Sequence, residues 1–287
     1  MSRWTHTLIF AASLLGAPLC WSQQPPAPAP SSARILLLPK RIVTGERATL
    51  AVLDVNGRLT PGVTVNFSNR DHLVTDATGR ARFAAPLAAG VIYATIGERP
   101  ERIYTTILRH SEAPADSVQI SLAPRFSSLS DRFELSGSGF CGEADANSIR
   151  LGGKPALVLA ASPASLIALP PADLPAGNTR VEVTCANRSA PPFSVTFLDL
   201  SLEADDSPLG PGERRALTVR VHGTDAKVSL QAHNLAPKVA NLAGGNTVTV
   251  SSQGGAENVA RFEVTGHERG SFNISIRLLS DLTPPTR

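Results

Sequence analysis

The stretch LDVNGRLTPGVTVNFSN, residues 53–69, places apolar side chains at alternate positions around two turn signals, Asn56-Gly57 and Pro61-Gly62. Alternate side chains of an extended strand point to the same face, so this spacing predicts strands with one buried face. Asparagine and glycine accept the positive φ that a tight hairpin requires. The stretch therefore predicts antiparallel strands that are connected by short turns.

The same pattern continues along the rest of the chain. In LVTDATGRARFAAPLAAGVIYATIG, residues 73–97, a turn at Asp76 to Gly79 is followed by apolar residues at Ala81 and Phe83. From Arg34 onward, short period-two runs are bounded by Gly, Pro, Asn and Asp, and no convincing helical period is found. This organisation is typical of antiparallel sandwiches. The sequence predicts an all-β protein made of tandem immunoglobulin-like β-sandwiches.

The period-two runs divide into three blocks. The chain has 287 residues, which exceeds the length of one ordinary sandwich. We expect sandwiches at residues 34–108, 117–198 and 199–281. In the first block, alternation predicts a core that contains Leu50, Val52, Val63, Val65, Phe67, Phe83, Ile92 and Tyr104.

Two motifs of the first block match a known family. They are D-x-NG-x-x-x-PGV-x-V-x-F from Asp54 to Phe67 and TDATGRARF from Thr75 to Phe83. Both resemble the bacterial immunoglobulin-like (Big-type) domains of invasin-type surface proteins, where TDANGKA is common at the second motif. The resemblance implies an immunoglobulin-like sandwich of a bacterial surface protein.

The second block resembles the IPT/TIG domain, another immunoglobulin-like fold. The matching features occur in the family's order: Gly137-Ser138-Gly139-Phe140, Ile149, Gly152-Gly153, Leu166-Ile167 before Pro170, Gly177 and Val181–Val183. The basic recognition loop of the family's DNA-binding members is not evident, so the resemblance implies the fold and not DNA binding. The third block alternates strongly, as in Leu217, Val219 and Val221, and is assigned to no family.

The N-terminal residues predict export. Arg3 precedes the apolar run LIFAASLLGAPL, and cleavage after Ser22 would remove residues 1–22 as a signal peptide. The proline-rich residues 23–33 then form an extended linker. Acylation of Cys20 is the alternative, but Pro18-Leu19 stands where a lipoprotein signal has a small residue before the cysteine. We expect a bacterial protein that is secreted, periplasmic or on the cell surface, with no transmembrane segment after the leader.

Removal of Cys20 leaves two cysteines, both in the second block. An even pair in an exported chain indicates a disulfide. In the register that the TIG resemblance implies, Cys141 follows the strand that ends at Phe140, and Cys185 ends the strand RVEVT, so the two could meet at one pole of the sandwich. The resemblance thus favours a Cys141–Cys185 bridge, and the alternative is two buried free thiols.

No motif for catalysis, a metal or a cofactor is present. The chain lacks HExxH, zinc-spaced cysteine–histidine pairs, a Walker loop, a dinucleotide fingerprint and a G-x-S-x-G elbow. Asp54-Val55-Asn56-Gly57 and the cluster Glu203, Asp205 and Asp206 lack the remaining ligands of known calcium motifs, which favours a turn and a solvated linker. The net charge of +3 without basic runs argues against a nucleic-acid surface. The histidines outside the leader are expected to be solvated: His72, His110, His222, His233 and His267.

Aromatic residues are scarce. Trp4 and Trp21 both lie in the predicted leader, and Tyr93 and Tyr104 are the tyrosines. Sugar-binding modules usually need exposed aromatic platforms, whereas arginine-led protein contacts need none, so a carbohydrate module is disfavoured.

These observations favour an exported, non-enzymatic protein that acts in adhesion, envelope scaffolding or protein binding, with protein partners at the envelope or outside the cell. The fold supports that role only by analogy. Two alternatives stay open. The first is an accessory binding or spacer module of an exported polysaccharide-processing system, which exposed aromatics on a flat sheet would favour. The second is a hydrolase, which convergent buried carboxylates would favour.

Overall fold

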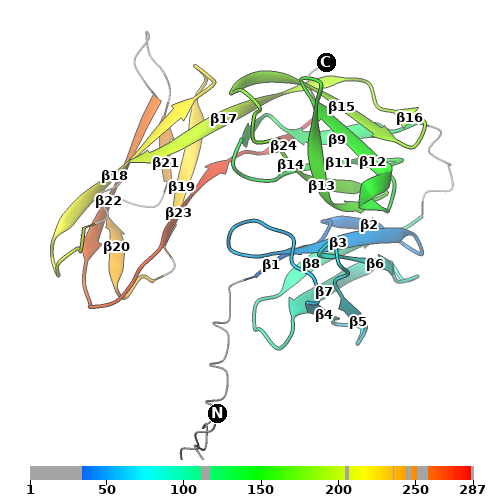
Figure 1. The fold of residues 1–287 in the computed structure, drawn as a ribbon, viewed down its shortest axis with the longest axis horizontal. Helices are drawn as coiled ribbons and strands as arrows, with labels where there is room; N and C mark the ends of the chain where they lie inside the picture. Colours follow the sequence, from blue (N-terminus) through cyan, green and yellow to red (C-terminus); the bar gives the residue numbers. More distant parts are fainter. Residues whose placement is uncertain are drawn as a thin grey trace, which may run out of the picture. The chain divides into compact units, whose positions relative to one another are not determined.

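The structure is a computed structural model, and it describes residues 34–110, 117–203, 207–234, 236–243, 247–250 and 258–285. The predicted signal peptide and linker lie outside the described residues, as do Asp205 and Asp206. Residues 34–287 form one compact unit. Within the described residues the chain is almost entirely β, with a single short 3₁₀ helix, and it folds as tandem immunoglobulin-like β-sandwiches (Figure 1). The terms first, second and third sandwich denote the strands of residues 34–108, 117–198 and 199–281, the blocks that the sequence predicts.

The first sandwich packs a three-stranded sheet, β1-β3-β6, against a five-stranded sheet, β2-β8-β7-β4-β5. All neighbouring strands are antiparallel except β2 and β8. Hairpins turn where the sequence predicts them, and Gly57, Gly62 and Gly79 all have positive φ. The strands are β1 Ile35–Leu37, β2 Arg41–Val43, β3 Arg47–Leu53, β4 Thr64–Phe67, β5 His72–Val74, β6 Arg80–Ala84, β7 Gly90–Ile96 and β8 Ile103–Leu108.

The core of the first sandwich agrees with the predicted alternation at all positions but one. Six of the predicted residues are buried (Leu50, Val52, Val63, Val65, Phe67 and Ile92), and Phe83 is half-buried against the same cluster. The prediction was wrong for Tyr104, which is 60% exposed. Thr105 and Ile107 point inward instead, because the buried Thr105 hydroxyl donates to the Pro39 carbonyl oxygen and so needs no water.

The second sandwich contains a strand that belongs to both of its sheets. The C-terminal half of β13 pairs with β14, its N-terminal half pairs with β12, and the register shifts between Val158 and Ala160. Such a β-bulge bends a strand from one sheet into the other. The elements are β9 Gln119–Pro124, β10 Phe126–Ser128, β11 Phe133–Ser138, the 3₁₀ helix η1 Ala144–Ala146, β12 Asn147–Leu151, β13 Lys154–Ser162, β14 Ser165–Leu169, β15 Gly177–Cys185, β16 Arg188–Ser189 and β17 Phe193–Glu203.

The third sandwich shares a strand with the second. β17 pairs with β15 through residues 193–197 and with β18 through residues 199–203, so one strand crosses the predicted boundary at 198/199 without a break (Figure 1). The two sheets of the third sandwich are β20-β22-β18-β17 and β21-β19-β23. The remaining strands are β18 Arg214–His222, β19 Val228–Asn234, β20 Ala240–Ala243, β21 Thr247–Val250, β22 Asn258–Gly266, β23 Ile274–Leu279 and β24 Leu282–Thr283.

A second connection also ties the third sandwich to the second. After β23 the chain returns, and β24 pairs with β9 of the second sandwich, at Leu282↔Pro124 and Thr283↔Ala123. Phe126 of the second block and Leu198 both pack in the apolar core of the third sandwich. The division into three independent domains therefore remains a proposal.

This sharing leads to a prediction for fragments. We expect residues 34–198 to fold alone and residues 199–287 to fold poorly, because a cut at 198/199 removes Phe126 and Leu198 from the third core. Loss of a large buried side chain typically costs about 2–5 kcal/mol, and a domain is stable by only about 5–15 kcal/mol. Circular dichroism and proton NMR of both fragments measure this. A dispersed spectrum and an unchanged melting temperature for residues 199–287 would show an independent domain instead.

Candidate functional site

The first and second sandwiches are joined by a shared sheet edge. β3 pairs with β13 through Thr49 and Ala161. Beside this contact, an apolar cluster buries residues from both sandwiches: Leu37, Ala51, Leu53, Leu159, Ala160 and Ile167. Strand pairing with a common apolar layer connects the two sandwiches more closely than a linker between separate domains would.

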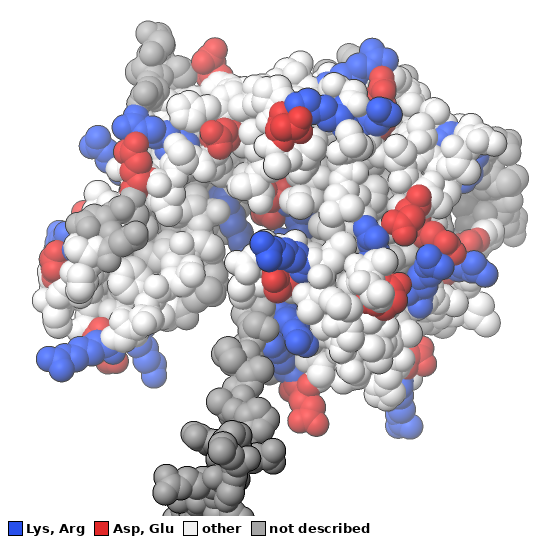
Figure 2. All heavy atoms as spheres, viewed as in Figure 1, with Lys and Arg blue, Asp and Glu red and all other residues white. Residues whose placement is uncertain are grey.

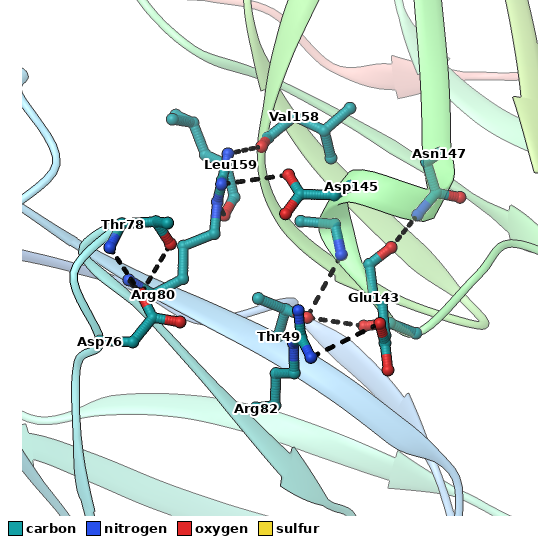
Figure 3. Close-up of polar contacts among 12 residues, drawn as sticks. Thr49, Asp76, Thr78, Arg80, Arg82, Glu143, Asp145, Asn147, Val158 and Leu159 are labelled. Atoms are coloured by element: carbon teal, nitrogen blue, oxygen red, sulfur yellow. Dashed lines mark hydrogen bonds and ion pairs between the residues drawn. The ribbon is translucent and has the colours of Figure 1, made fainter.

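Arg80 is the central polar residue of this joint. It lies at the start of β6 and is only 7% exposed. Its Nη2 donates to the Val158 carbonyl oxygen at 2.6 Å, its Nε donates to the Leu159 carbonyl oxygen at 3.2 Å, and its Nη1 pairs with Asp145 at 3.2 Å (Figure 3). These carbonyls belong to the bulge of β13, where the ladder is interrupted. The guanidinium therefore donates to backbone acceptors at a point where the regular ladder is disturbed.

The turn TDATGR fixes the start of the strand that carries Arg80. Asp76 Oδ1 accepts hydrogen bonds from the Thr78 hydroxyl at 2.6 Å and from the Thr78 and Arg80 backbone amides. The Thr78 hydroxyl bond, followed by the two backbone amides, lowers the pKa of Asp76 below its ordinary value. The carboxylate is thus the form that holds this turn.

A second polar group of the joint surrounds Thr49 (Figure 3). The Thr49 hydroxyl donates to the Gly142 carbonyl oxygen at 2.8 Å and accepts from the Ala144 amide at 3.3 Å. A Cβ at position 142 would lie 1.9 Å from the Arg47 carbonyl oxygen, so only glycine fits there. Arg47 in turn pairs with Glu143 at 3.2 Å.

A cleft of about 940 Å³ opens where residues of all three sandwiches meet. Among its lining residues are Arg102 and Tyr104 of the first sandwich, Phe126 and Glu134 of the second, and Leu202 and Arg277 of the third. Leu202 is 50% exposed, although it is a large apolar side chain. A concave surface is the default candidate for a binding site, and this one combines apolar side chains with a comparable share of polar and charged ones.

The charged residues of the cleft fall into two groups. Lys40 pairs with Glu134 at 3.1 Å and Arg132 pairs with Asp131 at 3.4 Å. Arg102 and Arg277 line the cleft as well and are exposed. No ion pair or hydrogen bond of either side chain occurs among the described residues, so both guanidinium groups are available to a ligand.

The two tyrosines lie next to each other on the outer face of the five-stranded sheet. Tyr93 of β7 pairs directly with Tyr104 of β8, and their ring centroids are 6.4 Å apart. Tyr93 is 45% exposed. The sequence did not predict this pair, because Tyr104 was assigned to the core. The signal for Tyr93 was present: it follows Ile92, which was predicted to point inward, so Tyr93 had to lie on the outer face. The pair is a small exposed aromatic surface beside the cleft, which Tyr104 also lines.

Cys141 and Cys185, the predicted disulfide, are joined in the structure, with their Cα atoms 5.5 Å apart. Asn147, the register partner of Cys185, also donates from Nδ2 to the Cys141 carbonyl oxygen at 2.9 Å. Cys185 lies in the core of the second sandwich. The bridge thus closes one end of that sandwich.

The histidines and carboxylates that were weighed from the sequence as possible ligands lie apart from one another. All five histidines of residues 34–287 are exposed, and they occupy different strands and turns. Asp54 accepts from the Asn56 and Arg58 amides, as a turn residue does. Glu203 pairs with Arg220 at 2.7 Å, and the pKa of Glu203 is lowered by that arginine. Within the described residues no three metal-ligating side chains gather.

Charges of both signs are interspersed on the face shown in Figure 2. Basic residues form no continuous stripe there, in contrast to a dedicated nucleic-acid surface. Over the described part of the chain, helices with the length and hydropathy of a membrane span were not found.

Comparison with known proteins gives similar structures but no family. No family profile and no curated protein matches the chain. Among similar solved structures is a Bacteroides ovatus protein, SGBP-B of the mixed-linkage glucan utilization locus, in complex with a mixed-linkage heptasaccharide; it is 12% identical, with a TM-score of 0.30, over 87% of this chain and 76% of that one. The extracellular region of plexin A4 is 8% identical, with a TM-score of 0.32, over 90% of this chain and 29% of that one.

The immunoglobulin domains 1–5 of Sidekick-1 are 15% identical, with a TM-score of 0.25, over 82% of this chain and 60% of that one. All three TM-scores are below 0.5, so the immunoglobulin-like assignment rests on the strand pairing described above.

Proposed function

We propose that this chain is an exported, non-enzymatic scaffold that binds a protein partner at the cell envelope or outside the cell. The cleft carries the proposal. It is lined by residues of three sandwiches. The pairing of β3 with β13 and the buried Arg80 join the first sandwich to the second, and β17 joins the second to the third. Walls that are connected by paired strands should lose less conformational entropy on binding than walls on flexible linkers, which favours a recognition surface.

Site-specific photo-crosslinking in cells tests this proposal. A photoreactive residue at Leu202, inside the cleft, is expected to yield an adduct with an envelope or extracellular protein. Leu157 of the second sandwich is the matched control, because it is 47% exposed and lies outside the cleft. Equal adducts at both positions, or none at either in correctly exported protein, would contradict a binding role of the cleft.

The exposed tyrosine pair favours a second candidate, a polysaccharide-binding accessory module. Tyrosine rings provide flat apolar surface with a polar edge, and the pair lies on the kind of exposed sheet face that such modules use. For this function, Tyr93→Ser with Tyr104→Ser should abolish retardation in affinity electrophoresis through a soluble polysaccharide. The double variant should lose only about 0.2–1 kcal/mol of stability, because the lost cross-strand pair is exposed. Unchanged mobility of the parent protein across neutral and acidic polysaccharides would eliminate this candidate.

A further inference from the structure

The outer edge of β23 faces the cleft. In its sheet, β21-β19-β23, this strand pairs only with β19 as far as the described residues extend. Four consecutive residues, Ser275 to Leu278, line the cleft. Side chains alternate between the faces of a strand, so consecutive lining residues show that the strand meets the cleft along its edge.

An edge strand exposes main-chain N–H and C=O groups that have no hydrogen-bond partner in a neighbouring strand. The N–H and C=O groups of β23 that point away from β19 make no backbone hydrogen bond among the described residues. At one end of this edge, the Phe126 amide donates to the Ser280 hydroxyl. Exposed edges are normally shortened, charged or covered, because they recruit other strands. A six-residue edge that borders a cleft is suited to an added strand.

The surroundings of this edge define the chemistry of the occupant. Arg102 and Arg277 are the cleft cations without a partner among the described residues, whereas Lys40 and Arg132 are already paired with carboxylates. Leu202 and Tyr104 provide exposed apolar surface in the same cleft. A matching ligand therefore carries an extended backbone, acidic side chains and apolar side chains.

We propose that the cleft binds an extended acidic segment of a partner protein, which adds as a strand to the edge of β23. This inference rests on the proposed function and names the class of its partner. Main-chain hydrogen bonds to β23 supply affinity, as in other strand-addition complexes. Arg102 and Arg277 select acidic side chains and raise the association rate. The proline-rich residues 23–33 do not match this ligand, because proline has no N–H for a ladder and the segment has no acidic residue.

Peptide binding to the full chain tests the inference. The probe is a fluorescein-labelled octapeptide of alternating glutamate and valine, and its binding is followed by anisotropy. A peptide with lysine in place of glutamate should bind at least about tenfold more weakly. Two further peptides carry N-methyl groups, one on the glutamates and the other on the valines. Only one of these two sets of residues can donate its N–H groups to β23, so one peptide should bind about tenfold or more weakly and the other almost as tightly as the unmethylated peptide.

Protein variants complete the test. Arg102→Glu with Arg277→Glu should weaken binding of the glutamate peptide at least about tenfold. Arg261→Glu is the matched control, an exposed arginine of the third sandwich that does not line the cleft, and it should bind as the parent does. Hydrogen exchange should show protection of residues 274–279 on binding.

Three results would overturn the inference. One is the absence of any binding by the glutamate peptide. Another is binding of both N-methylated peptides as tightly as the unmethylated peptide, which indicates charge attraction without a ladder. The third is displacement of the peptide by polygalacturonate at equal charge concentration, which indicates an acidic polysaccharide site. If the peptide fails while the Leu202 crosslink persists, strand addition is wrong and the scaffold function stands; if both fail, neither stands.

Discussion

Arg80→Ala is expected to lower the free energy of unfolding by about 2–4 kcal/mol, because it removes the hydrogen bonds that a buried guanidinium donates to the carbonyl oxygens of the buried residues Val158 and Leu159. Asp145 also loses its partner, but its side chain is largely exposed and water compensates for most of that loss. Urea denaturation measures the change. The single transition expected for the joined first and second sandwiches should also separate into two.

Arg82→Ala is the matched control for this effect. Arg82 lies on the same strand, is mainly exposed and pairs with Glu143 at 3.8 Å. Its loss should change stability by about 0.5 kcal/mol or less. Arg80→Lys should recover little of the stability that Arg80→Ala loses, because one ammonium group cannot reproduce the guanidinium donors that reach two carbonyl oxygens. Equal effects of Arg80→Ala and Arg82→Ala would show that the buried contacts do not hold the joint.

Cys141→Ser with Cys185→Ser should destabilise the second sandwich by about 3–4 kcal/mol, as the chain-entropy account predicts for a bridge across 44 positions. Thermal denaturation of the variant should show the loss. Reduction of the parent protein should reproduce it, because both treatments remove the same cross-link. Thiol labelling of denatured, unreduced protein is the direct assay, and two reactive thiols per chain would mean that the cysteines are free.

The fold class could be predicted from local pattern alone. Period-two runs and the turns at Asn56-Gly57 and Asp76–Gly79 depend on neighbouring residues, so the strands of the first sandwich follow from the sequence. The phase of β8 could not be settled in this way, because a threonine can point inward when its hydroxyl finds a carbonyl, as Thr105 does. The burial of Tyr104 was therefore predicted incorrectly.

The joint and the cleft depend on contacts between residues that are distant in sequence. Arg80 binds carbonyls 78 and 79 residues further along the chain, and those carbonyls lie at a bulge of β13. Similarly, β17 crosses a boundary that alternation placed at 198/199, because a period-two run reads the same whether a strand ends or enters a second sheet. Arg102 and Arg277 belong to different sandwiches, so spacing could not bring them together.

Tension between the second and third sandwiches would act along β17. That strand is held in the second sandwich by antiparallel β15 on one side and parallel β10 on the other. A pull along its axis loads these hydrogen bonds together in shear, whereas a pull across a hairpin breaks them one at a time. The return strand β24, paired with β9, adds a second route for the load. A junction of this kind resists stretching far better than a flexible linker.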